Sequence, residues 1–318
     1  MDLGAQHQGD LRPADGLRVP VHGQALKVLL TGANGFLGAA LRRRLARGHA
    51  VTSVVRPGKA APELCWDAGD AAGAAALVGR HKPELVVHCA AQAKPDPCEA
   101  DPAGTRAVNV AGAAALAEAA AAAGARFFFF SSDQVHDGRT GLYEDDSPAS
   151  PLSEYGRQKR DAEDAVLAAG GDALVFRLAL CFGFSPPGAP PNWIDDMRAA
   201  LAAGRPVRVF TDQKRSALAV TDAAELVARA AAKPGTPEGR RLLNLAGPAP
   251  VSRAEFGEAF CAAFGFDPAL LARAKAAESP MAAPRPLDCS LQGARLHAWA
   301  GFTPAPVREA LARLARGA

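Results

Sequence analysis

The chain has 318 residues, enough for one large α/β domain or for a domain with a smaller partner. Hydrophobic residues make up 49% and charged residues 22%, a composition typical of globular proteins that excludes disorder for most of the chain. The 36 basic and 33 acidic side chains leave a formal charge of +3, spread along the sequence. A nucleic-acid-binding surface is therefore not expected.

Targeting and metal-binding signals are missing from the sequence. Residues 1–24 contain neither the apolar core nor the cleavage site of a signal peptide, and we interpret them as a flexible leader. No run of about 18 strongly apolar residues predicts a membrane span. The six cysteines are widely separated, and no pair of histidines has metal-ligand spacing. We expect a cytoplasmic protein with reduced thiols, no catalytic metal and no membrane contact.

From residue 25 onward, short apolar runs alternate with helix-length segments rich in Ala, Leu, Arg and Glu. The predicted strands are 26–30, 50–55, 85–89, 127–130 and 173–177. The predicted helices are 35–47, 104–123 and 154–169. This alternation is typical of repeated βαβ units, so we predict an α/β protein with a doubly wound parallel sheet, a Rossmann fold, over residues 25–180.

The pattern changes after residue 180. A segment dense in proline and glycine, 183–191, precedes predicted helices at 192–203 and 222–232 and a strand at 207–210. Further elements are expected at 242–245, 253–264 and 307–316. We interpret residues 181–318 as mainly a smaller, substrate-binding lobe, and a return of the chain to the Rossmann domain stays open.

Residues 27–38, KVLLTGANGFLG, form an apolar strand that leads into three glycines and then into a helix. Glycines permit the tight turn and let the backbone approach a pyrophosphate, while the helix N-terminus offers free N–H groups to the anion. The segment predicts a dinucleotide-binding loop, with a plain strand–turn–helix as the alternative. The expected cofactor contacts in it are Gly32, Asn34, Gly35, Phe36 and Leu37.

Residues that follow the next predicted strands indicate which dinucleotide binds and where it contacts the protein. Arg56 follows the second strand, where an NAD-preferring site usually carries an acid, and it could pair with a 2′-phosphate. NADP(H) is therefore preferred and NAD(H) is the alternative, unless Arg56 is simply a solvated surface residue. Asp67 follows a predicted third strand and could accept a hydrogen bond from adenine. The small residues Ala90 and Ala91 leave space for the dinucleotide at the edge of the sheet.

A tyrosine and a lysine are spaced four residues apart in a predicted helix. Tyr155 and Lys159 would lie on one face, where the cation would stabilise phenolate and lower the tyrosine pKa toward that of a working general acid. Ser132 ends the preceding strand and could hold a carbonyl oxygen beside the phenol. A surface pair without function is the alternative.

Taken in order, these motifs resemble those of the extended short-chain dehydrogenases/reductases over roughly residues 25–180. The matching segments are TGANGFLG at 31–38, VNVAG at 108–112 and the set Ser132, Tyr155 and Lys159. SSDQVHDG at 131–138 and YGRQKRDAE at 155–163 are similar to the dTDP-4-dehydrorhamnose reductase family. RPLDCS at 285–290 also resembles a relative of that family, the regulatory β subunit of methionine adenosyltransferase.

The resemblance implies roles for individual residues. Ser132 would polarise a substrate carbonyl, Tyr155 would donate the proton, and Lys159 would tune Tyr155 and bind the nicotinamide ribose. Asn109 would support this geometry from a neighbouring helix. The substrate contacts expected from the resemblance are Gln134, His136, Leu180 and Trp193. At the first three of these positions the family usually carries aromatic residues.

The implied function is an NADP(H)-dependent carbonyl reductase acting on a nucleotide-linked 4-keto sugar. One alternative is a dinucleotide-binding regulatory subunit of a partner enzyme, and another is a nucleotide-sugar epimerase or dehydratase that retains NAD. NADPH turnover with a keto substrate would separate the first two. The oligomeric state stays open, with a homodimer as one alternative.

Overall fold

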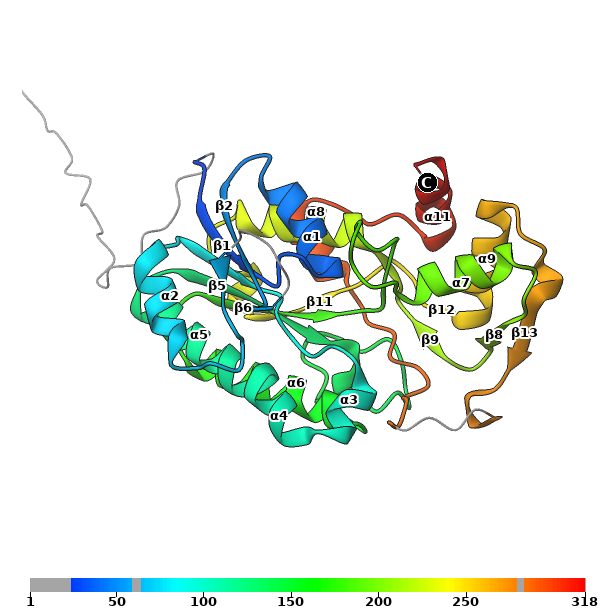
Figure 1. Ribbon diagram of the computed structural model, residues 1–318, viewed down its shortest axis with the longest axis horizontal. Coiled ribbons are helices and arrows are strands. Elements are labelled where there is room, and N and C mark those ends of the chain that lie inside the picture. Colours follow the sequence, from blue (N-terminus) through cyan, green and yellow to red (C-terminus); the bar gives the residue numbers. More distant parts are fainter. Residues whose placement is uncertain (1–23, 59–63, 279–282, 318) are drawn as a thin grey trace, which may run out of the picture.

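The computed structural model describes residues 24–58, 64–278 and 283–317, so the expected leader lies outside the described residues except for its last position. Its larger part is built on a seven-stranded parallel sheet (Figure 1). The strands, in spatial order, are β11 (Leu242–Leu245), β6 (Ala173–Leu178), β5 (Arg126–Ser132), β4 (Leu85–His88), β1 (Lys27–Thr31), β2 (Ala50–Val55) and β3 (Leu64–Cys65). The order reverses between β1 and β4, which places the switch point of a doubly wound fold there.

Helices cover both faces of this sheet. One face packs on α1 (Phe36–Leu45), α8 (Val220–Ala231) and α10 (Ala294–Ala300). The other face packs on α2 (Gly73–His81), α5 (Gly112–Ala122) and α6 (Glu154–Ala168). Because both faces are covered, the central strands consist mainly of apolar residues; in β5, which runs from Arg126 through four phenylalanines to Ser131 and Ser132, every residue is buried.

The helix expected at 104–123 is interrupted. The short helices α3 (Pro95–Ala100) and α4 (Pro102–Arg106) lead into a π-helical turn, Ala107–Ala111, which continues into α5. At the junction a β-carbon on Gly112 would lie 1.7 Å from the carbonyl oxygen of Ala68, so only glycine permits this approach. The turn also directs Asn109 into the interior, where it is 1% exposed.

A smaller lobe follows β6. It contains β7 (Cys181–Phe182), α7 (Trp193–Ala202), β8 (Val207–Phe210), β9 (Lys214–Arg215), β10 (Leu218–Ala219), β12 (Val251–Ser252), α9 (Arg253–Phe264), β13 (Leu271–Ala274) and α11 (Val307–Arg316). Phe182, Phe256 and Phe260 are fully buried in its own apolar core. Between these elements the chain returns to the large sheet, because β11 pairs with β6 and α8 packs on the α1 face.

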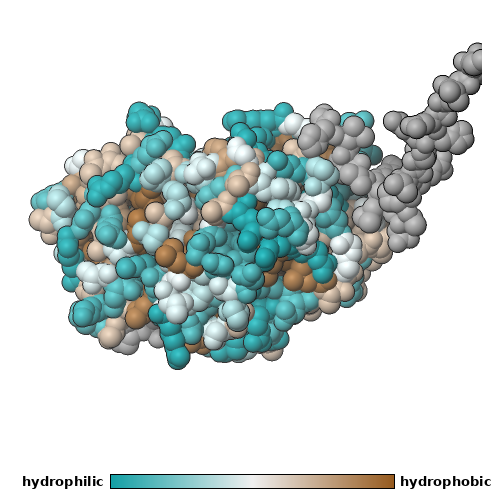
Figure 2. Space-filling view, turned by 180° about the vertical axis from the view of Figure 1, so that it is seen from behind, coloured by the Kyte–Doolittle hydropathy of each residue, from teal (hydrophilic) through white to brown (hydrophobic). Residues whose placement is uncertain are grey.

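The surface is mainly polar where it is visible from behind, and the apolar residues on that face lie in small separate groups (Figure 2). Among the described residues, no helix is both long and apolar enough to cross a membrane.

Candidate functional site

A cavity of about 400 Å³ opens at the carboxyl ends of β1, β2 and β4, beside the switch point of the sheet. A pocket of this size at this place is the usual position of a dinucleotide in a doubly wound fold. Seven of the expected cofactor residues line it: Gly32, Asn34, Gly35, Arg56, Asp67, Ala90 and Ala91. The sequence prediction did not name Thr31, Gln92 and Thr105, which also line the cavity.

The glycine loop fits tightly against its neighbours. Gly32 has a φ of +65°, and a β-carbon on it would lie 2.8 Å from the backbone nitrogen of Ala90. A β-carbon on Gly38 would lie only 2.1 Å from the carbonyl oxygen of Gly32. These approaches bring the start of α1 against the end of β1 and leave backbone at the cavity wall. Phe36 and Leu37 pack against the apolar core below the loop.

Two charged side chains, Arg56 and Asp67, line the cavity. Arg56 is exposed at the end of β2 and has no ion pair within the described ranges. Asp67 accepts a hydrogen bond from the backbone N–H of Gly69 at 2.9 Å. An unpaired guanidinium at this point is free to contact a phosphate.

Ser132, Tyr155 and Lys159 gather at the carboxyl edge of β5, next to the cavity-forming strands. Ser132 is the last residue of β5, and the other two lie on the first turns of α6. The side chain of Ser153 caps this helix by accepting a hydrogen bond from the N–H of Gly156. All three predicted catalytic residues are buried, with exposed fractions of 6%, 6% and 3%.

The electrostatics of this group differ from the expectation. Burial raises the pKa of Tyr155 above its usual value, although the Ser132 hydroxyl acts in the opposite direction. Burial also lowers the pKa of Lys159 to about 8. The Lys159 ammonium donates a hydrogen bond to the carbonyl of Phe130 at 2.9 Å and lies 4.9 Å from the ring centre of Phe129. The prediction of a lowered tyrosine pKa is therefore wrong for the free protein, because burial, assisted by the negative charge of Asp133, outweighs the hydrogen bond of Ser132.

Asn109 connects the cofactor cavity to the catalytic helix. Its side-chain oxygen accepts a hydrogen bond from the N–H of Gln92 at 2.8 Å, and its amide donates to the side chain of Gln158 at 2.8 Å. Gln158 is fully buried, and its own amide donates to Thr105 at 2.9 Å. Gln158 lies between Tyr155 and Lys159 in sequence, but nothing in its residue type distinguished it beforehand.

The four expected substrate contacts fall into different surroundings. Gln134 is half-buried with an unpartnered side-chain oxygen, and Leu180 is half-buried. His136 is 0% exposed, and its ring stacks on Tyr143 with centres 3.9 Å apart. The expectation that His136 contacts substrate does not fit this complete burial. Trp193 is half-buried, and one face of its ring is covered by the guanidinium of Arg253, whose central carbon lies 3.9 Å from the ring centre.

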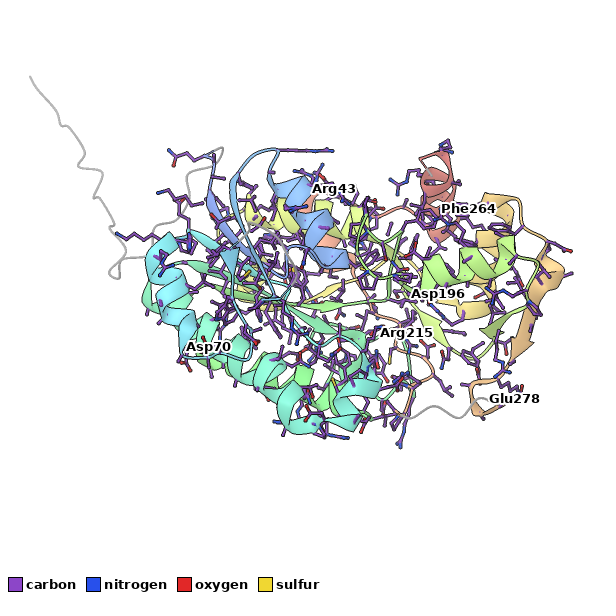
Figure 3. All side chains as sticks on the ribbon, viewed as in Figure 1. Arg43, Asp70, Asp196, Arg215, Phe264 and Glu278 are labelled. Carbon is purple, nitrogen blue, oxygen red and sulfur yellow. The ribbon has the colours of Figure 1, made fainter. Side chains whose placement is uncertain are left out.

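An ion pair that the sequence did not predict joins the catalytic edge to the smaller lobe. Asp133, directly after Ser132, lies 3.2 Å from Arg215 of β9. Arg215 also donates hydrogen bonds to the carbonyls of Pro286 and Leu287, and it lies at the junction of the two parts of the molecule (Figure 3). The Ser132 hydroxyl donates to Asp133 at 3.2 Å, so this pair borders the catalytic serine directly.

Comparison with known proteins identifies the family of the chain. The family model described as RmlD substrate binding domain matches residues 26–317. The chain belongs to this family. It is 31% identical to the probable low-salt glycan biosynthesis reductase Agl14 of Haloferax volcanii, covering 90% of this chain and 96% of the relative. It is 34% identical to a dTDP-4-dehydrorhamnose reductase of Mycobacterium tuberculosis, covering 89% and 90%.

Two further matches complete the comparison. The methionine adenosyltransferase 2 subunit beta of Xenopus laevis is 33% identical, but the match covers only 49% of this chain and 47% of that protein. A crystal structure of dTDP-4-dehydrorhamnose reductase from Bacillus anthracis in complex with NADP superposes with a TM-score of 0.80 at 21% identity, covering 93% of this chain and all of that one. The predicted fold class and the predicted family resemblance are confirmed.

Proposed function

We propose that the protein is an NADPH-dependent reductase of the extended short-chain type that reduces the keto group of a nucleotide-linked 4-keto sugar. The observation that carries this proposal is the gathering of Ser132, Tyr155 and Lys159 at the carboxyl edge of β5, beside a cavity built for a dinucleotide. The names of the full-length relatives, a dTDP-4-dehydrorhamnose reductase and a glycan biosynthesis reductase, support the sugar nucleotide as substrate.

The residues of the cavity suit NADPH. Gly32 and Gly35 leave backbone at the cavity wall where α1 begins, and the free N–H groups at this helix N-terminus would hold the pyrophosphate. Arg56 has no competing ion pair within the described ranges and can bind the 2′-phosphate, so NADPH is favoured over NADH. When bound, NADPH supplies the hydride for the reduction.

The buried residues supply the proton and the orientation. Because burial keeps the pKa of Tyr155 high, the phenol is protonated at neutral pH and can donate its proton to the forming alkoxide. Ser132 can hold the same oxygen through its hydroxyl. The Lys159 ammonium donates a hydrogen bond to the carbonyl of Phe130 and would contribute positive charge beside the nicotinamide ribose when the cofactor is bound.

The proposal also includes a cytoplasmic location and leaves a homodimer as one possible assembly. None of the six cysteines forms a disulfide, which suits a reducing cytoplasmic compartment. A homodimer is consistent with such folds but is not required by this site, whose catalytic residues all come from one chain.

The decisive assay follows NADPH oxidation by the purified protein with dTDP-4-dehydrorhamnose. We expect turnover that falls about 10²–10⁴-fold in Tyr155→Phe, because the ring still packs while the transferable proton is lost. The dissociation constant of NADPH should stay nearly unchanged in this variant. Wild-type protein that binds NADPH but turns over no keto sugar, and forms a stable complex with a partner enzyme, would instead establish the regulatory-subunit alternative.

A further inference from the structure

Arg253 is an arginine without an acidic partner at the inner side of the smaller lobe. It is half-buried, and its Nη1 atom is buried with no hydrogen-bond partner among the described residues. No ion pair joins it to a described carboxylate, although 14 other arginines have such a pair. A buried, unpaired guanidinium is unfavourable unless a ligand supplies its partner.

The pairing of two short strands explains where this arginine lies. In the antiparallel pair of β9 and β12, Val251 lies opposite Arg215, and continuing the register puts Arg253 opposite Gln213. The backbone N–H of Arg253 donates to the carbonyl of Gln213 at 2.9 Å. Arg253 is the first residue of α9, directly after β12, and its guanidinium is close enough to that of Arg215 for the two charges to repel each other. Gln213, Arg215 and Arg253 therefore form one cluster, called the Arg253 face here, and Arg215 connects this face to Asp133 at the catalytic edge.

The charges on this face do not cancel. The Asp133 carboxylate is engaged by Arg215, whose remaining donors bind backbone carbonyls. Glu255, the acid nearest to Arg253 in sequence, accepts the N–H of Ser252 in a capping box at 2.7 Å. Burial and the repulsion of Arg215 lower the pKa of Arg253 to about 10, which leaves it charged at neutral pH. The face therefore carries one uncompensated positive charge.

Trp193 holds this charge in place. Its indole N–H donates to the carbonyl of Cys181 at 3.3 Å, and its ring packs on Phe256 with centres 4.9 Å apart. The guanidinium of Arg253 stacks on its face. Because this face is occupied, Trp193 does not offer it to a sugar ring. Its expected role as a direct substrate contact changes to that of a support for Arg253.

We propose that Arg253 binds the diphosphate of the nucleotide-linked substrate and that Trp193 is a positioning residue that fixes its guanidinium. This inference rests on the proposed function, since the diphosphate is the anionic group of such a substrate. The reacting carbonyl must lie at Ser132 and Tyr155, and the link from Ser132 through Asp133 and Arg215 leads from that point to the face that carries Arg253. A planar guanidinium suits two oxygen atoms of a diphosphate.

The test measures binding rather than turnover, so it is independent of the reductase assay. Thymidine 5′-diphosphate and thymidine are titrated into the NADPH-saturated full chain by calorimetry. Arg253→Met should weaken binding of the diphosphate about 10–100-fold and leave thymidine binding unchanged, whereas Arg253→Lys should retain part of the affinity. Trp193→Leu should reduce the preference for the diphosphate, and Trp193→Phe should restore most of it.

The matched control is Arg198→Met. Arg198 lies in the same lobe and stacks on an aromatic ring, Phe184, at 4.0 Å, but it is exposed on α7. We expect no change in either affinity. An unchanged dissociation constant for NADPH shows that each variant is folded. The proposal is overturned if the wild type does not distinguish thymidine 5′-diphosphate from thymidine, or if Arg253→Met and Arg253→Lys both bind the diphosphate like Arg198→Met.

Discussion

The cofactor cavity and the face of the smaller lobe that carries Arg253 are assembled in different ways. Most of the cavity wall consists of short stretches that directly follow strands, such as 31–35 after β1 and 89–92 after β4, and much of it is backbone. The Arg253 face comes from β9 and from the start of α9 directly after β12; the pairing of β9 with β12, across 35 intervening residues, brings these segments together, and the function of the face depends on charged side chains. A cavity of the first kind is fixed by local motifs, whereas a face of the second kind exists only after long-range pairing.

The largest effect is expected from a substitution that disrupts the close backbone packing of the glycine loop beside the cofactor cavity. In Gly38→Val, the added atoms collide with the carbonyl of Gly32, which a β-carbon would approach to 2.1 Å. Overpacking of this kind costs about 3 kcal/mol, so NADPH affinity should fall roughly 100-fold or the melting temperature should drop by several degrees. Calorimetry and thermal unfolding measure both. Gly48→Val is the control, because nothing lies within 4 Å of its β-carbon position.

A smaller effect is expected on the preference for NADPH over NADH. Arg56→Ala should lose about 10–100-fold in NADPH affinity and little in NADH affinity, because a charge-assisted contact with the 2′-phosphate contributes about 1.5–3 kcal/mol. Titration of both cofactors into both proteins tests this. The control is Arg43→Ala, which removes an exposed arginine on α1 and should change neither the NADPH nor the NADH dissociation constant (Figure 3). Equal wild-type affinities for NADPH and NADH would contradict the assignment.

The pH dependence of kcat/KM reports on Lys159 at the catalytic edge, which lies between the cofactor cavity and the Arg253 face. Since the pKa of Lys159 is lowered to about 8 in the free protein, its positive charge is lost as the pH rises through this value. The kcat/KM for NADPH should therefore fall about tenfold per pH unit above pH 8, while the raised pKa of Tyr155 keeps the proton donor in its acid form. In Lys159→Arg the decline should move to higher pH. A flat profile up to pH 10 would show that the ammonium is not required.

The smallest expected effect concerns the sugar-binding surface. Gln134→Tyr together with Leu180→Trp restores aromatic residues at the two half-buried positions where the family usually has them. Stacking contributes about 0.5–1.5 kcal/mol, so kcat/KM for dTDP-4-dehydrorhamnose should rise by at most about tenfold. The single variants give the two contributions separately. If kcat/KM for dTDP-4-dehydrorhamnose decreases in both single variants, Gln134 and Leu180 serve a different substrate.

The sequence predicted the parts of the molecule that depend on local order. The glycine loop and the Tyr155–Lys159 spacing are contiguous, and the structure places them as expected, at the cavity and on one turn of α6. Arg253 and Arg215 could not be recognised, because a single arginine in sequence is indistinguishable from a solvated one until strand pairing brings it beside its neighbours.

Two other expectations failed for the same physical reason, which is burial. His136 follows the catalytic strand closely in sequence, but Tyr143 covers its ring and the carbonyl of His136 accepts a contact from the Cys289 thiol, 153 residues away. The pKa of Tyr155 rises because the complete fold removes water from the phenol. The burial in both cases is completed by residues distant in sequence, such as Cys289 beside His136.

The proposed function requires that hydride passes from NADPH to the keto carbon of a nucleotide-linked sugar while Tyr155 supplies the proton. The most direct measurement uses NADPH carrying deuterium at the transferable position of the nicotinamide, with dTDP-4-dehydrorhamnose as acceptor and NMR of the sugar product. We expect one deuterium at the former carbonyl carbon, and a rate at least 100-fold lower in Tyr155→Phe. Product without deuterium at that carbon, or equal transfer by Tyr155→Phe, would contradict it.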